Sequence, residues 1–154
     1  QSIRSLGVKL KLSSTKTMVQ NKSIILIDDS LVRGTTCHKI VKMLYESGAK
    51  EVHVRIACPE IKFPDFYGVD MPTKEELLAN VKSTKEMCEY LKAASLKFLS
   101  LDGLYKALAG EARNATYPQF SDHYFTGDYP IKPNDNIKGL KVKQLSLLSV
   151  KSSS

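Results

Sequence analysis

The stretch IILIDDSLVRGTT, residues 24–36, decides the fold of this 154-residue chain. The apolar run over residues 23–27 is short and β-branched, which is typical of a strand buried on both faces of a parallel sheet. From Thr36 onward apolar residues recur at helical spacing, and Gly48 stands where a helix C-cap is expected. Residues 51–57 (EVHVRIA) alternate in the manner of a second strand. Strand, loop, helix and strand predict a βαβ unit with a right-handed crossover.

The remaining segments predict helices that flank this sheet. Residues 58–72 hold three prolines and one glycine and form a long connection. Two capping-box patterns each open a helix, at Thr73-x-x-Glu76 and Ser83-x-x-Glu86. Further on we expect a short strand over 97–101, a helix that Asp102 caps and Gly110 ends, loops over 111–139 and an edge strand in the tail. The predicted fold class is α/β, with residues 1–110 as the α/β part and 111–154 as a loop-rich extension.

Composition narrows the class of protein. No apolar run approaches the roughly 18–20 residues of a membrane span, and the N-terminal residues do not resemble a signal peptide, so we expect no membrane association. Three widely spaced cysteines make neither a disulfide framework nor a metal knuckle, and they fit a reduced, cytoplasmic setting: Cys37, Cys58 and Cys88. We expect them to be small buried residues rather than nucleophiles.

The net charge of +7 is concentrated near the loop. The first 50 residues carry nine lysines and arginines against three acidic residues, but their one aromatic residue is Tyr45. Nucleic-acid-binding surfaces usually interleave aromatic residues with a basic stripe, so we expect no nucleic-acid partner. The excess indicates either a small anionic ligand or simply a solvated basic surface.

The loop combines the groups that bind a phosphate monoester. Ligands of open α/β sheets bind beyond the carboxyl ends of the strands, where this loop lies. A helix that begins near Thr36 offers unpaired N–H groups, and Gly34 lets the backbone approach an anion closely. Thr35 adds a hydroxyl donor and Arg33 adds a positive charge.

The acidic pair at the start of the loop suits a different part of a ligand. Asp28 and Asp29 can serve one ligand if the strand ends there, and neighbouring carboxylates suit a vicinal diol or a divalent cation that bridges it. A diol at one end and a phosphate at the other describe a ribose 5-phosphate. The alternative is that Asp29 or Ser30 only caps the following helix.

At this point the segment resembles the phosphoribosyl pyrophosphate (PRPP) fingerprint of type I phosphoribosyltransferases. The flanks GVKLKL, FYGVDMPTKEELLA, SLDGLYKALAG and YFTGDYP resemble the amidophosphoribosyltransferase family, from about residue 1 to residue 130. The resemblance implies a partial type I phosphoribosyltransferase fold. It also implies that the intact enzyme converts PRPP, glutamine and water into 5-phosphoribosylamine, pyrophosphate and glutamate, the first committed step of purine synthesis.

The resemblance also implies a set of site residues. Asp28 and Asp29 would contact the ribose hydroxyls and help to hold Mg²⁺, and Lys11 would meet phosphate groups unless it is only a surface lysine. The 5-phosphate would be held by the rest of the loop, namely Ser30, Arg33, Gly34, Thr35 and Thr36. Purine nucleotides would act as feedback inhibitors, and the intact enzyme would be a homo-oligomer.

Three departures from the family limit these expectations. The N-terminal glutaminase domain and the early half of the phosphoribosyltransferase domain would both be missing, so we expect the 154-residue chain to be inactive alone. Some relatives hold an iron–sulfur cluster, and three of its cysteines would fall at Asp65, Ser121 and Tyr124, so we expect no such cluster. The alternative functions are a non-catalytic PRPP or nucleotide sensor and a salvage phosphoribosyltransferase, although FYGVDMPTKEELLA and FTGDYP disfavour the latter.

Overall fold

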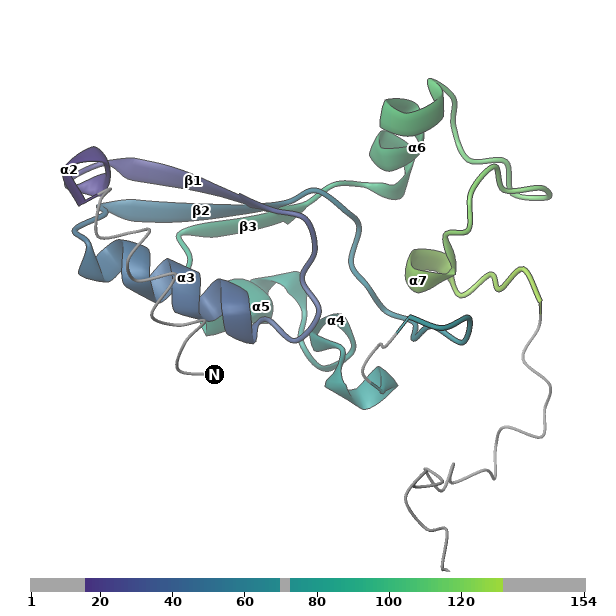
Figure 1. The fold of residues 1–154 in the computed structure, drawn as a ribbon, viewed down its shortest axis with the longest axis horizontal. Helices are drawn as coiled ribbons and strands as arrows, with labels where there is room; N and C mark the ends of the chain where they lie inside the picture. The colour runs from purple at the N-terminus through teal and green to yellow at the C-terminus, as the bar shows by residue number, and fades with distance from the viewer. Residues whose placement is uncertain (1–15, 70–72, 132–154) are drawn as a thin grey trace, which may run out of the picture.

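The computed structural model describes residues 16–69 and 73–131, which form an α/β domain with an extension (Figure 1). Its three-stranded sheet has the order β1-β2-β3, from Ser23–Asp28, Glu51–Ile56 and Ser95–Phe98. Both strand pairs are parallel, with Leu26 opposite Val54 and Val54 opposite Leu96. The predicted βαβ unit and its parallel sheet are therefore confirmed.

Helices α3 (Thr35–Glu46) and α5 (Thr84–Leu91) lie on the same face of the sheet (Figure 1). The short helix α2 (Lys16–Val19) lies beside the start of β1, and α4 (Leu78–Val81) lies near α5 (Figure 1). Apolar side chains of both long helices meet alternate residues of the central strand to form the core, including Val41, Leu44, Met87, Leu91, Val52, Val54 and Ile56. This packing fixes the start of α3 against the carboxyl end of β1.

The prediction that the first strand is buried on both faces of the sheet is wrong. Ile25 and Ile27 of β1 are 64% and 73% exposed, so this strand is not buried on both faces. Successive side chains of a strand point to opposite faces, and the described helices cover only the face that Ile24 and Leu26 share. On the open face His53 and Arg55 of β2 both contact the Ser95 hydroxyl, at 2.9 and 3.0 Å.

The capping patterns in the sequence predicted where helices occur, but some predicted boundaries of helices and strands differ from the structure. The capping box of Thr73 and Glu76 is present, but it opens a 3-10 turn, η1 (Lys74–Glu76), rather than one continuous helix. The chain is extended at Leu77 before α4 begins, and this break buries both Leu77 and Leu78. Strand β3 begins two residues before the predicted strand.

Helix α6 (Leu101–Ala109), at the end of the α/β part, and helix α7 (His123–Thr126), in the extension, lie beyond the carboxyl ends of the strands (Figure 1). The Ser100 hydroxyl, and not Asp102, caps α6, while Gly110 ends it as predicted. The described residues contain no helix that is both long and apolar enough to cross a bilayer. The predicted edge strand of the tail lies outside the described residues.

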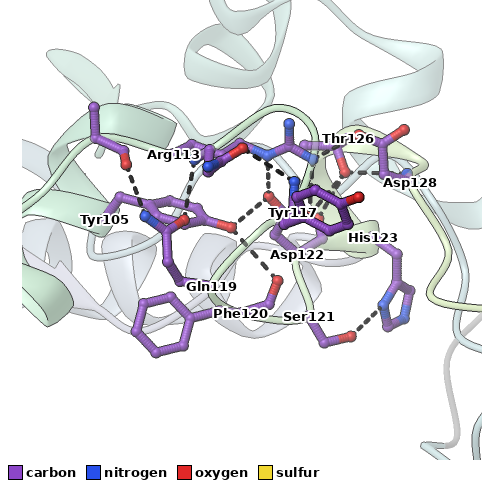
Figure 2. Close-up of polar contacts among 12 residues, drawn as sticks. Tyr105, Arg113, Tyr117, Gln119, Phe120, Ser121, Asp122, His123, Thr126 and Asp128 are labelled. Atoms are coloured by element: carbon purple, nitrogen blue, oxygen red, sulfur yellow. Dashed lines mark hydrogen bonds and ion pairs between the residues drawn. The ribbon is translucent and has the colours of Figure 1, made fainter.

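A buried polar network joins the extension to α6 (Figure 2). Asp122 is 3% exposed and accepts hydrogen bonds from the Tyr105 hydroxyl at 2.8 Å and from Arg113 Nε at 2.5 Å. Arg113 Nη2 also donates to Asp128, and the Thr126 hydroxyl donates to Asp122 at 3.1 Å. Burial alone would raise the pKa of Asp122, but the hydrogen bonds from Arg113, Tyr105 and Thr126 outweigh it and lower that pKa.

Candidate functional site

A cavity of about 350 Å³ lies at the carboxyl end of β1, where the chain turns into α3. Among the residues that the structure describes, one continuous segment lines it, from the end of β1 to the first turn of α3: Asp28, Asp29, Ser30, Leu31, Val32, Arg33, Gly34, Thr35, Thr36 and Cys37. The structure therefore brings together every predicted site residue except Lys11, which lies outside the described residues. This is the edge of the sheet at which ligands of open α/β folds bind.

Gly34 shapes the phosphate end of this cavity. It is the N-cap of α3 and adopts a left-handed conformation with φ of 73°, which a side chain rarely tolerates. A Cβ atom at this position would lie 2.7 Å from Leu78 Cδ2 and 3.1 Å from Tyr90 Cε1. The backbone therefore passes close to the core at this point, and no side-chain hydrogen bond caps the helix. The N–H groups of the first turn, at Thr35, Thr36 and Cys37, have no intrahelical acceptors, because helix geometry supplies none.

The two carboxylates form the other end of the cavity. Asp28 is the last residue of β1, and its Oδ1 accepts a hydrogen bond from the Asp29 amide at 3.1 Å. Asp29 in turn accepts from the Ser30 hydroxyl at 3.2 Å. Because Gly34 is the N-cap of α3, the alternative that Asp29 or Ser30 only caps the helix is wrong.

Arg33 has a partner that the sequence did not reveal. Its Nη2 and Nε lie 3.1 and 3.3 Å from Glu76 Oε1, although the two residues are 43 positions apart. The Thr73 amide and the Arg33 charge lower the pKa of Glu76, against a smaller opposing effect of burial. The capping-box pattern identified Glu76 as a residue with a structural role, but no spacing rule connects it to the loop.

Two cysteines lie close to the acidic pair. Burial raises the pKa of Cys37 to about 11, and the charge of Asp28 adds to the effect. Burial likewise raises the pKa of Cys58 to about 11, with further contributions from Asp29 and Asp28. Both thiols therefore stay protonated at neutral pH and are poor nucleophiles. The predicted burial is confirmed for Cys37, but it is wrong for Cys58 and Cys88, which are only partly buried.

The three positions at which relatives would have iron–sulfur ligands do meet in space. Asp65 Oδ1 lies 2.9 Å from His123 Nε2 and 3.1 Å from the Tyr124 hydroxyl, and Ser121 Oγ lies 3.0 Å from His123 Nδ1. Asp65 Oδ2 also accepts from the amide of Val69 at 2.7 Å. A carboxylate, a hydroxyl and a phenol do not fit an iron–sulfur cluster, which cysteine thiolates hold. A hydrogen-bonded cluster occupies these positions instead.

Fold and loop together define a class of protein: a parallel α/β domain whose polar, glycine-containing loop leads from a strand into the N-terminus of a helix. The chain matches no protein-family model. It is 53% identical over 150 residues to amidophosphoribosyltransferase from Rhizobium etli, a match that covers 97% of this chain and 30% of that protein. It is 47% identical over 144 residues to the chloroplastic amidophosphoribosyltransferase 1 of Arabidopsis thaliana, which covers 94% of this chain and 24% of the relative.

Solved structures agree with these relatives. A glutamine PRPP amidotransferase from B. subtilis, complexed with ADP and GMP, has a TM-score of 0.70 and 41% identity over 78% of this chain and 26% of its own. A structure described as the allosteric regulatory enzyme of purine biosynthesis has a TM-score of 0.65 at the same identity and coverage. The chain is thus a homologue of the amidophosphoribosyltransferases, and it spans 24–30% of the length of these curated relatives.

Proposed function

We propose that this chain supplies the PRPP-binding loop of an amidophosphoribosyltransferase. The complete reaction transfers glutamine-derived ammonia to PRPP and gives 5-phosphoribosylamine, pyrophosphate and glutamate in the first committed step of purine synthesis. Because the chain spans less than a third of its curated relatives, we assign to it only the recognition of the ribose 5-phosphate part of the substrate.

The start of α3 is the proposed 5-phosphate site. Backbone N–H groups of Thr35 and Thr36 lie in the first turn, where the helix dipole favours an anion. Hydroxyl groups of the same residues and of Ser30 add donors, and the Arg33 guanidinium adds a positive charge. The left-handed Gly34 is required because it lets the loop turn into the helix beneath the phosphate.

The acidic pair is the proposed ribose and Mg²⁺ site. Two carboxylates that line one cavity fit Mg²⁺, which proteins usually bind through one or two carboxylates together with substrate oxygens. Asp28 and Asp29 would hold the ion and accept hydrogen bonds from the ribose hydroxyls. When bound, Mg²⁺ would neutralise charge that develops on the leaving pyrophosphate. The loop itself positions the sugar and stabilises its phosphate.

Regulation and assembly extend the same proposal. Purine nucleotides carry a ribose 5-phosphate, so the groups that would bind PRPP also suit a nucleotide, and the B. subtilis relative was solved with ADP and GMP. We therefore propose purine nucleotides as feedback ligands of this loop and Lys11 as a further phosphate contact. The intact enzyme is proposed to be a cytoplasmic homo-oligomer in which residues 1–110 complete a phosphoribosyltransferase domain and residues 111–154 form its extension.

One observation carries the proposal: carboxylates and a helix N-terminus face one cavity from a single continuous loop. Titration of the chain with ribose 5-phosphate and Mg²⁺, followed by NMR, tests it directly. We expect the amide signals of Gly34, Thr35 and Thr36 to shift with a common dissociation constant, and ribose without phosphate to leave them unchanged. Shifts confined to residues distant from the loop would refute the assignment.

A further inference from the structure

The segment from Thr73 to Leu78 contacts the loop through its backbone and through the Leu78 side chain. The Leu78 amide donates a hydrogen bond to the Val32 carbonyl at 2.9 Å, although the two residues lie in different parts of the chain. The Leu78 side chain is 6% exposed and packs against Gly34, where an added Cβ would meet its Cδ2 atom. The loop thus depends on this segment for both its backbone path and its packing.

Glu76 extends this support to the Arg33 side chain. Its two carboxylate oxygens have separate partners: Oε1 accepts from Nε and Nη2 of Arg33, and Oε2 accepts from the Thr73 amide at 3.1 Å and the Thr73 hydroxyl at 3.4 Å. The capping box therefore fixes the carboxylate, and the fixed carboxylate holds the guanidinium along its Nε–Nη2 edge. This arrangement directs the Nη1–Nη2 edge, the second fork of the guanidinium, away from Glu76.

From this geometry we infer that Glu76 is a positioning residue for anion binding, acting through Arg33. The inference rests on the proposed function of the loop. The two side chains are 54% and 49% exposed, and an exposed ion pair adds little to folding stability, so its main effect is on orientation. An arginine that is already ordered loses less side-chain freedom when it binds a phosphate with its second fork.

Glu76→Gln tests this inference, because glutamine keeps the capping box but removes the charge that holds Arg33. Glu75→Gln is the matched control: it removes the same charge from the exposed neighbour in the same turn, outside the Arg33 pair. We expect Glu76→Gln to bind ribose 5-phosphate about three- to tenfold more weakly than Glu75→Gln does, the range of one ordered side chain. The dissociation constants come from the amide shifts of Gly34 and Thr36.

A double-mutant cycle separates positioning from a general structural role. In an Arg33→Gln background, Glu76→Gln is expected to cause no further weakening, because Arg33 transmits the whole effect. Arg33→Lys tests the same geometry without altering the capping box, and it should weaken binding to a similar degree because lysine has no fork.

Each remaining outcome has a defined meaning. Equal affinities of Glu76→Gln and Glu75→Gln, or weakening that persists without Arg33, would overturn the positioning role. Tighter binding by Glu76→Gln would also overturn it and would make Glu76 a competitor of the phosphate. If the unsubstituted chain itself shows no shift at Gly34–Thr36, the proposed function fails first and the inference fails with it.

Discussion

Replacement of Gly34 by alanine tests how the loop is built, because the structure provides a matched control. Gly34 and Gly110 both have φ of +73°, but a Cβ at Gly110 would meet nothing within 4 Å. Gly110→Ala therefore carries only the cost of a left-handed alanine, roughly 1–2 kcal/mol. At Gly34 the same change adds a contact of 2.7 Å with Leu78 Cδ2.

The size of the added penalty follows from what the new methyl group meets. Leu78 Cδ2, at 2.7 Å, is the end of a flexible side chain, and Tyr90 Cε1, at 3.1 Å, needs to move by only a few tenths of an ångström, so the extra cost is at the lower end for overpacking, about 1 kcal/mol. We expect Gly34→Ala to lose about 2.5 kcal/mol and Gly110→Ala about 1.5 kcal/mol. For a chain of this length these losses lower the melting temperature by roughly 7 °C and 4 °C respectively.

Thermal unfolding of both variants by circular dichroism measures these losses, and titration with ribose 5-phosphate measures the consequence for the site. Gly34→Ala should lose most of its binding, because the added methyl group and the strained backbone move the first turn of α3. Gly110→Ala, at the end of α6, should bind normally. Equal losses of stability would refute the packing of Leu78 against Gly34, and normal binding by Gly34→Ala would refute its role in the phosphate site.

Three further predictions concern the loop and the Asp65 cluster. Asp28→Asn and Asp29→Asn should change the unfolding free energy by about 1 kcal/mol or less but abolish the Mg²⁺ dependence of ribose 5-phosphate binding, measured by calorimetry with and without Mg²⁺. Thr36→Val should weaken that binding by about 1.5–3 kcal/mol, the contribution of a hydrogen bond to a charged group, with an unchanged circular dichroism spectrum. Burial alone would raise the pKa of Asp65, but hydrogen bonds from Val69, His123, Tyr67 and Tyr124 outweigh it and hold that pKa at about 2. Because the pKa of Asp65 is lower in the folded than in the unfolded chain, ionised Asp65 stabilises the fold fully above about pH 4, and this stabilisation is lost as the pH falls towards 2. Urea unfolding at pH 5 and pH 2.5 should show a lower free energy of unfolding at the acidic pH. Asp65→Asn should reduce the difference between the two.

The parts of the fold that were predictable are those encoded by consecutive residues. The βαβ unit follows from an apolar run, a polar loop and a helical pattern, each of which occupies one stretch of chain. The prediction that β1 is buried on both faces was wrong because it too rested on consecutive residues alone. An apolar run shows that Ile25 and Ile27 tolerate burial, but what covers the second face depends on elements elsewhere, and α3 and α5 both pack on the opposite face.

The residues of the site could likewise be predicted where they are consecutive in the sequence, but their distant partners could not. In the part of the chain that the structure describes, one continuous segment lines the cavity, so its residues could be named from the sequence without knowledge of any tertiary contact. Glu76 lies 43 positions from Arg33, and His123 lies 58 positions from Asp65, so neither contact has a periodicity or spacing that could predict it. The sequence identified Glu76 only as part of a capping box, and it gave no signal for His123, which lies in a loop-rich segment.

This division follows from how a loop of this kind recognises an anion. Donors that belong to the backbone carry no side-chain signature, and their directions depend on the φ and ψ angles of a few residues. Those angles are in turn fixed by neighbours that contribute no atom to the cavity: the Leu78 amide donates to the Val32 carbonyl, and the Leu78 side chain packs against Gly34. The residues that line the site can therefore be identified from one segment of the sequence. The residues that fix the backbone geometry of that segment come from distant parts of the chain that pack against it. Substitutions at Leu78 should accordingly alter ribose 5-phosphate binding even though this side chain lies outside the cavity.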